Sequence, residues 1–350
     1  MTDDLLGKIF YHLCETGPLS LRHLLFVSRR FYYAAVNNAH LWTTIYFDSL
    51  FAHHFHQWRE QGDIFIEQCL LRSGSLPLCL SIDDTDPYEY GLTVFHHPLE
   101  TFGKPEWRGL QRCTSMILKN RPLTASRVAH IVALLPKSLP SLQYISLSNF
   151  SDPTDGSQFP NCPMLERVEM FDYGQPSPPF WGTNLLKVTT LSFGNITNWM
   201  AYDITDTLSQ FPMLHDLTLS TESGRGYLVI DSPQLPINFN RLRILRAHGY
   251  IPPDVVAKLV APALKDLHIK ANVEHITPID ALQHLSEPHC QYIHALLPKG
   301  VSAMEPEWAT NLSNLVQKCT RIKSLYISKW MEKKCKKFLR GRDDVILHVQ

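Results

Sequence analysis

The sequence lacks a net charge, because its 33 lysine and arginine residues balance 33 aspartate and glutamate residues. It therefore has no whole-protein field of the kind that draws proteins to nucleic acid or to anionic membranes. No apolar run approaches the roughly 20 residues that span a bilayer. The first apolar stretch is interrupted by Lys8 and His12, unlike a secretory signal. We expect a cytoplasmic or nuclear protein whose partners are proteins, with no nucleic acid and no membrane.

Sequence motifs for catalysis and for metal binding are also missing. The eight cysteines include no C-x-x-C pair, which argues against a disulfide framework and a zinc ribbon. His53, His54 and His56 lie among aromatic residues without carboxylate or cysteine spacing for a metal. G-x-S-x-G, G-x-x-x-x-G-K-[ST], G-x-G-x-x-G and H-E-x-x-H do not occur. We expect no cofactor, no metal and no catalytic residue; an enzyme would need a titratable cluster that spacing does not reveal.

The first 45 or so residues carry apolar side chains at helical spacing. A first helix is predicted over residues 3–14 and should end near Gly17-Pro18. A second stretch follows it, and a third is predicted to carry Val27, Phe31 and Ala35 on one stripe before Leu41-Trp42. Three short helices bury only a small core, so such a unit would be stabilised by docking to another protein.

From about residue 100 onward a pattern of the form L-x-x-L-x-L recurs. Its clearest copies begin at Leu142, Leu165, Val188, Leu214, Leu242, Leu264 and Ile322. The first six are separated by 23, 23, 26, 28 and 22 residues, within the range of leucine-rich repeats. Each copy is predicted to supply one short strand with three inward apolar side chains, and stacked copies would form a curved solenoid. The Asn or Cys usually found three residues after the last leucine of a copy is present only as Asn272, which predicts an irregular array.

The stretch from Asp4 to Trp42, with LLGKIFYHL, LLFVSRRFYYAA and LW, closely resembles an F-box. LLRSGSLPLCLSI at residues 70–82 and the later FPNCPML and FPMLHDLTLS look like the F-box-like proteins of fungi, in which such repeats follow the box. The resemblance implies an α/β (α+β) fold, a three-helix F-box followed by an irregular leucine-rich-repeat solenoid. Its expected parts are the F-box at 1–48, a linking region at 49–105 that is helical and then strand, and the repeats with a C-terminal cap at 106–350.

What the resemblance implies is docking of the box onto a Skp-family adaptor and, through it, onto the cullin of a ubiquitin ligase. The chain would be the substrate-recognition subunit, a non-catalytic component that raises the local concentration of a substrate. The residues that match the apolar set of the box are Leu5, Leu6, Ile9, Leu13, Leu24, Val27, Phe31, Leu41 and Trp42. Sequence does not divide those that hold the helices together from those that face the adaptor. The alternative is a leucine-rich-repeat interaction scaffold without a ligase role.

The outward strand positions, read from the repeat register, are the candidates for substrate binding. The aromatic and basic members of this set are Tyr144, Arg167, Phe171, Arg246, His248, His268, Lys270 and Tyr326. Aromatic and arginine side chains among small polar ones are typical of protein-binding surfaces. An equally simple interpretation is that these polar residues only keep an exposed sheet soluble. The basic run at residues 333–337 is interpreted as the solvated face of a terminal helix, with nuclear targeting as the alternative.

Overall fold

The chain is a mixed α/β protein built largely from parallel strands. In a computed structural model, the described residues are 6, 9–10, 27–48, 59–84, 108–120, 132–149, 158–172, 181, 184–194, 207–220, 236–249, 251, 253–270, 279–282, 285, 289–297 and 308–350. The chain divides into an N-terminal unit of Met1–Leu165 and Pro179–Asn184 and a C-terminal unit of Glu166–Pro178 and Leu185–Gln350. Within the described residues, no helix combines the length and the apolar character needed to cross a membrane.

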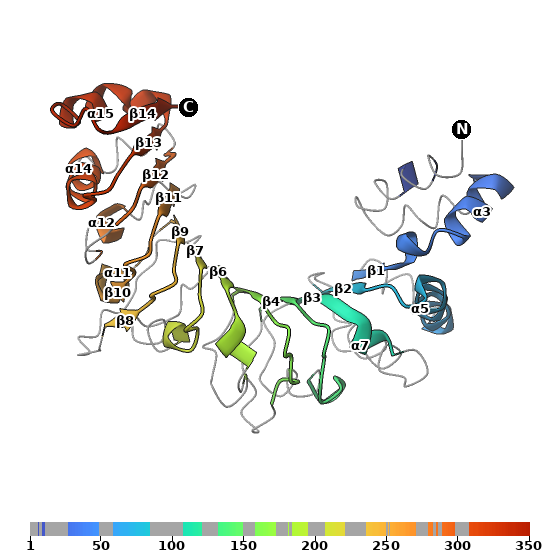
Figure 1. Cartoon of the computed structure of the whole chain (residues 1–350). Coiled ribbons are helices and arrows are strands. Elements are labelled where there is room, and N and C mark those ends of the chain that lie inside the picture. Colours follow the sequence, from blue (N-terminus) through green and yellow to red (C-terminus); the bar gives the residue numbers. More distant parts are fainter. Residues whose placement is uncertain are drawn as a thin grey trace. The chain divides into compact units, whose positions relative to one another are not determined.

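The N-terminal unit joins short helices to four parallel strands. Its helical elements are α3 (Arg29–Val36), η1 (Ala39–Trp42), α5 (Arg59–Ser73) and α7 (Gly109–Arg112). Its strands are β1 (Thr44–Asp48), β2 (Leu78–Asp84), β3 (Cys113–Asn120) and β4 (Tyr144–Ser148), paired in chain order (Figure 1). Strands β1 and β2 lie within the stretches predicted as box and linking region. The parallel sheet of this unit therefore includes strands that precede the first clear repeat copy.

Helix α3 begins at Arg29, because Ser28 is its N-cap. The Ser28 side chain accepts a hydrogen bond from the Phe31 backbone N–H at 3.1 Å, and Ser28 itself has an extended conformation. A capping serine pairs with one of the backbone donors left free in the first helical turn. Val27 therefore lies before the helix, and the expectation of one helical stripe through Val27, Phe31 and Ala35 is wrong at its first member.

Trp42 forms the core between α3 and α5. Its side chain is only 2% exposed, and its indole N–H donates to the backbone carbonyl of Ala35 at 2.9 Å. The guanidinium of Arg72, in the last turn of α5, lies 4.5 Å from the centre of the indole ring. A buried tryptophan needs such a partner for its N–H, and the ring attracts the cation. Trp42 thus contacts both helices.

Arg112 pairs with the carboxyl end of α5. Its guanidinium donates to the carbonyl of Gly74, to the carbonyl of Leu76 at 3.2 Å, and to the side chain of Ser73 at 3.3 Å. The last carbonyls of a helix have no partner within the helix, and a cation near them is favoured by the helix dipole. Arg112 therefore fixes the end of α5 against the start of β3.

Asn184 makes a second long-range polar contact in the N-terminal unit. Its side-chain oxygen accepts from the backbone N–H of Cys162 at 2.7 Å, and its side-chain amide donates to the carbonyl of Pro160 at 2.8 Å. Asn184 is 6% exposed, and both hydrogen bonds are buried, so its amide helps to satisfy backbone groups that lie away from solvent. This single amide thus bonds to two backbone groups of the segment 160–162.

The C-terminal unit contains eight parallel strands in one sheet. They are β5 (Arg167–Phe171), β6 (Thr190–Gly194), β7 (Asp216–Ser220), β9 (Ile244–His248), β11 (Asp266–Lys270), β12 (Tyr292–Ala295), β13 (Ser324–Ile327) and β14 (Ile346–Val349). The connections hold η2 (Asn184–Lys187), β8 (Ile237–Asn238), α11 (Pro253–Lys258), β10 (Leu259–Val260), α12 (Ile279–Leu282), α14 (Trp308–Lys318), η3 (Lys329–Met331) and α15 (Glu332–Phe338). The helices from α11 to α15 lie along one side of these strands (Figure 1).

The register of these strands matches the sequence pattern. The first apolar row across the sheet consists of Val168, Leu191, Leu217, Leu245, Leu267, Ile293, Leu325 and Leu347. From β5 to β13 every member of this row is at most 1% exposed. The leading residue of each of the seven predicted copies is likewise buried. The prediction of one short strand with inward apolar side chains per copy is therefore confirmed.

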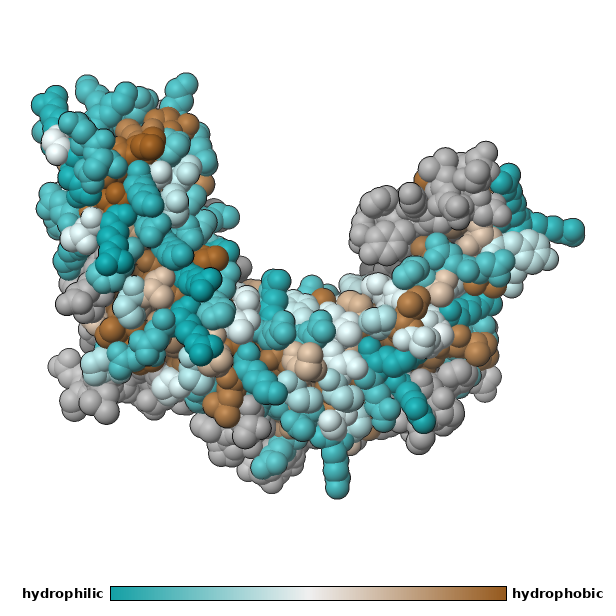
Figure 2. Space-filling view, in the orientation of Figure 1, coloured by the Kyte–Doolittle hydropathy of each residue, from teal (hydrophilic) through white to brown (hydrophobic). Residues whose placement is uncertain are grey.

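Two strands of the sheet were missed by the sequence pattern. Strand β12 follows Cys290, and its inward residues are Ile293 and Ala295, so only one of the three pattern positions holds a large aliphatic side chain. Strand β14 follows α15, where the sequence predicted only a terminal helix. In the space-filling view, the visible face of the C-terminal unit is mostly hydrophilic, with hydrophobic residues between (Figure 2).

Candidate interaction surfaces

The predicted adaptor-binding residues divide into buried and exposed side chains. Leu6, Leu41 and Trp42 are at most 4% exposed, whereas Ile9 is 41% and Val27 is 61% exposed. Phe31 is half-buried, and its ring packs against that of the buried Phe10 at 5.1 Å between centroids. The remaining predicted residues, Leu5, Leu13 and Leu24, lie outside the described residues. Leu6, Leu41 and Trp42 thus belong to the core, and Ile9 and Val27 are left at the surface.

Helix α3 adds two aromatic side chains to the exposed set. Ala35 is its only fully buried residue, while Tyr32 is 41% and Tyr33 is 61% exposed. The two tyrosine rings contact each other edge to face, with centroids 5.6 Å apart. Sequence reasoning left them out because it selected residues by an apolar stripe. Tyrosine is enriched in protein interfaces because one end of its ring is apolar and the other polar.

A row of stacked rings crosses the outward face of strands β11 to β14. The ring of His268 stacks on that of His294 at 4.2 Å, with 4° between the planes. His294 stacks on Tyr326 at 4.3 Å and 3°, and Tyr326 on His348 at 4.3 Å and 10°. We call these four residues the ring ladder. Parallel strands in register place the same position of each strand side by side, at nearly the spacing of stacked rings.

The sequence predicted only part of the ring ladder. His268 and Tyr326 belong to the predicted substrate-binding set, and His294 and His348 do not. Both missed residues lie on the two strands that the leucine pattern did not find. The string C-Q-Y-I-H-A at residues 290–295 is a degenerate copy of the repeat, and its register would have placed His294 beside His268.

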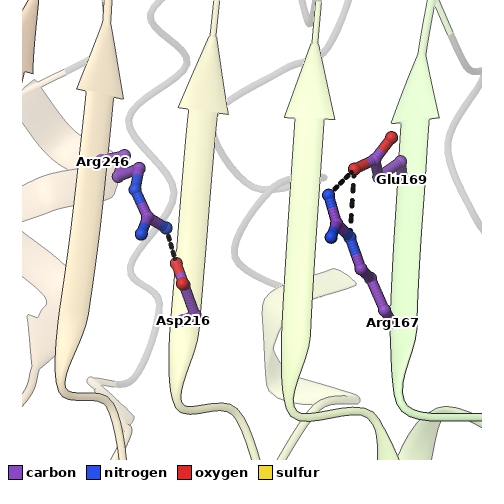
Figure 3. Close-up of polar contacts among 4 residues, drawn as sticks. All are labelled: Arg167, Glu169, Asp216 and Arg246. Atoms are coloured by element: carbon purple, nitrogen blue, oxygen red, sulfur yellow. Dashed lines mark hydrogen bonds and ion pairs between the residues drawn. The ribbon is translucent and has the colours of Figure 1, made fainter. Parts of the chain in front are cut away.

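Arg246 extends the ring ladder on strand β9, opposite His268 in the register. Its guanidinium pairs with the carboxylate of Asp216 on the neighbouring strand β7 (Figure 3). The Arg246 side chain keeps 35% of its surface exposed. His248 and Lys270 face each other one step further along the same two strands. The structure thus gathers Arg246, His248, His268 and Lys270, four of the predicted residues, on β9 and β11.

Burial and positive neighbours act on the histidines of this face. The pKa of His248 is lowered by burial first and then by Lys270 and Arg246. The pKa of His268 is lowered by burial, by His294 and by Arg246, against a smaller opposite effect of nearby aspartates. Burial also lowers the pKa of His294. At neutral pH these imidazoles are therefore held in the neutral form.

Of the other predicted substrate-binding residues, Tyr326 belongs to the ring ladder, and the remaining three lie apart from it. Arg167 and Phe171 are on β5, separated from β9 by β6 and β7. Arg167 is paired with Glu169 of its own strand at 2.5 Å (Figure 3). Phe171 is half-buried and covers Gly194 of β6, its register partner. Tyr144 is half-buried on β4 of the N-terminal unit.

The geometry of the ring ladder suits contact with a macromolecule better than coordination of an ion. The lone pair of a neutral imidazole lies in the ring plane, so stacked parallel rings direct their nitrogens side by side and not toward one point. Among the described residues, no group of three or more His, Cys, Asp or Glu side chains could hold a metal ion. The histidine cluster at residues 53–56 lies outside them. The outward ring edges instead offer hydrogen-bond donors and acceptors beside exposed cations.

The cysteines that the structure describes are free thiols, and all but Cys79 are buried. Burial raises the pKa of Cys113, Cys162 and Cys335 to about 12 in each case. A thiol with such a pKa stays protonated at neutral pH and is a poor nucleophile. These residues pack as small apolar side chains.

No protein-family model matches this chain, and no curated protein is similar enough to match it.

Proposed function

We propose that this chain is the substrate-recognition subunit of a Skp–cullin–F-box ubiquitin ligase. In this proposal a three-helix F-box at residues 1–48 binds a Skp-family adaptor and, through it, a cullin. An irregular leucine-rich-repeat solenoid over residues 106–350 binds a protein substrate. The chain itself is not an enzyme: it holds the substrate near a ubiquitin-loaded enzyme and raises the local concentration of the reacting groups.

The observation that carries the proposal is the uncovered apolar surface of the N-terminal helical residues. Ile9, Val27 and Tyr33 expose between 41% and 61% of their surface in a unit whose helix α3 fully buries only Ala35. Large apolar and aromatic side chains left exposed within a short helical stretch are typical of a surface that another protein covers. Leu41 and Trp42 are buried, and Trp42 donates its indole N–H to the Ala35 carbonyl of α3.

The second supporting observation is the outward face of strands β9 to β14. Its planar side chains are stacked and therefore hold fixed positions, and the half-buried Arg246 is held by Asp216. Preorganised aromatic and arginine side chains lose little conformational entropy on binding and dominate many protein interfaces. We assign substrate binding to this face.

Affinity purification of the full-length chain, followed by mass spectrometry, tests the proposal. Charge is introduced at the exposed positions, Ile9→Glu with Val27→Glu, because Leu6 is buried and a charged residue there would unfold the helices. Ile64→Glu is the matched control, since Ile64 is 55% exposed on α5 outside the box. Adaptor peptides should accompany the wild-type chain and the control, and should disappear with the double variant. A wild-type chain that recovers substrate candidates but no adaptor would favour the scaffold without a ligase role.

A further inference from the structure

Four side chains on strands β9 and β11 form two neighbouring cross-strand pairs. Arg246 lies opposite His268, and His248 lies opposite Lys270. We call these pairs the first and second rung. All four point to the outward face, because the alternate residues of both strands are buried in the core. The two rungs thus form a compact patch of residues that carry or can acquire a positive charge.

This patch can form further hydrogen bonds and ion pairs with a negatively charged ligand. Asp216 engages one terminal nitrogen of Arg246, which leaves other N–H groups of that guanidinium for a ligand. Lys270 is exposed, and no acidic side chain among the residues the structure describes forms an ion pair with it. His248 and His268 are half-buried and gain a charge when protonated. The patch therefore complements carboxylates.

The spacing of the rungs sets the geometry of the partner. Neighbouring strands lie about 4.8 Å apart, and positions two residues apart on one strand are separated by about 7 Å. An extended peptide laid along the strands shows every second side chain to the sheet, at the same separation of about 7 Å. Two acidic residues separated by one residue would therefore reach both rungs at once, whereas adjacent acidic residues would point to opposite sides.

We propose that the two rungs bind an extended acidic segment of a protein partner, in which two carboxylate residues are separated by one residue. One carboxylate pairs with Arg246 and His268, and the other with His248 and Lys270. The inference rests on the proposed function, because it names the substrate class of the same face. Asp266 lies next to the first rung at the amino-terminal end of β11, so a third acidic residue on that side would meet a like charge.

The protonation of the two histidines should couple to binding. The groups that face them are Arg246, Lys270, Asp266, His294 and, across Arg246, Asp216. In the free protein, burial and the positive neighbours lower the pKa of both imidazoles, and a bound carboxylate opposes this shift. Binding then takes up protons, so affinity should be higher near pH 6 than near pH 7.5.

Two fluorescein-labelled peptides of the same composition test the spacing. Gly-Ser-Glu-Ser-Glu-Ser-Gly carries the alternating acidic pair, and Gly-Ser-Glu-Glu-Ser-Ser-Gly carries an adjacent pair. Fluorescence anisotropy with the full-length chain should give about tenfold tighter binding for the alternating peptide, since only this peptide presents both carboxylates to the sheet at once. A third peptide, with one phosphoserine in place of the glutamates, distinguishes the source of the anion.

A variant pair tests the residues. His248→Asn with Lys270→Gln removes the second rung and should lower affinity for the alternating peptide about tenfold. Lys265→Gln is the control, because Lys265 is an exposed lysine just before β11 and belongs to neither rung. Equal affinity for the two glutamate peptides, unchanged affinity of the second-rung variant, or tighter binding of the phosphoserine peptide would each overturn the proposal. Adaptor binding, measured on the same preparations, should be unaffected by the second-rung variant. A wild-type chain that does not bind the adaptor would instead contradict the proposed function.

Discussion

The imidazole of His268 lies flat on that of His294, with 4.2 Å between centroids and 4° between planes. Such contact is favourable between neutral rings and unfavourable between two imidazolium ions. The ring ladder therefore makes the outward face of the C-terminal unit sensitive to pH.

The stability of the protein should fall as the pH decreases through the range of histidine titration. The pKa values of His248, His268 and His294 are lowered in the folded chain, chiefly by burial, relative to about 6.5 in the unfolded chain. The unfolded chain then binds more protons, so the stabilisation is fully present above about pH 7 and is lost below about pH 6.5. Urea unfolding followed by circular dichroism should show a lower midpoint at pH 5.5 than at pH 7.5.

The replacement His294→Phe isolates this effect, because phenylalanine keeps a stacked ring that does not titrate. The fall in midpoint between pH 7.5 and 5.5 should be smaller in this variant than in the wild type. A fall of equal size in both proteins would show that the ring ladder is not its source.

Removal of the Trp42 side chain should destabilise the N-terminal unit strongly. Trp42→Ala leaves a large cavity between α3 and α5 and removes the hydrogen bond to Ala35, so we expect a loss of about 3–5 kcal/mol in the free energy of unfolding. Tyr33→Ala, at an aromatic residue that is 61% exposed, should change it by no more than about 0.5 kcal/mol. Similar losses for the two variants would contradict the position of Trp42 in the core.

The substitution Arg112→Lys should cost stability although the charge is kept. A lysine has a single nitrogen and does not reproduce the fork that reaches Gly74, Leu76 and Ser73, so we expect a loss of about 1–3 kcal/mol. Arg108→Lys, at an exposed N-cap position of α7 where the side chain makes no capping hydrogen bond, serves as the control in the same thermal denaturation experiment. Equal melting temperatures for the Arg112→Lys variant and the wild-type protein would refute the role of the guanidinium.

Gly194 and Phe171 should be energetically coupled. A Cβ atom at Gly194 would collide with the ring of Phe171, its register partner on β5. Gly194→Ala should therefore cost about 1–3 kcal/mol in the wild-type background and clearly less in the presence of Phe171→Ala. A double-mutant cycle by urea denaturation measures this difference, and strictly additive effects would exclude the contact.

The strands of the C-terminal unit were predictable because each repeat copy specifies its own strand. Leucine or a similar residue at three fixed positions, as at Leu214, Leu217 and Leu219, is enough to fix the strand and its buried side. Strand β12 escaped prediction because Cys290 and Ala295 fill two of these positions with small side chains. Because β12 was not predicted, His294 was not predicted as an outward residue, and the full extent of the ring ladder was not recognised from the sequence.

The long-range polar contacts could not be predicted in the same way. Arg112 bonds to residues 36 to 42 positions earlier, and Asn184 to residues 22 and 24 positions earlier. No local periodicity encodes such contacts, since they depend on where the backbone has already been placed. Which predicted adaptor-binding residues are buried and which are exposed could not be predicted for the same reason. Leu6 and Ile9 fit one apolar pattern, yet Leu6 is buried and Ile9 is exposed.

The binding of the full-length chain to a purified Skp-family adaptor tests the central proposal most directly. Isothermal titration calorimetry should show a complex of micromolar or tighter affinity for the wild type. Ile9→Glu with Val27→Glu should weaken it at least about a hundredfold, because each buried unpaired charge costs several kcal/mol. The melting temperature should stay unchanged, because both residues are exposed in the free chain. No heat of binding for the wild type at micromolar concentration, or equal affinity of the double variant, would contradict the assignment of this surface to the adaptor.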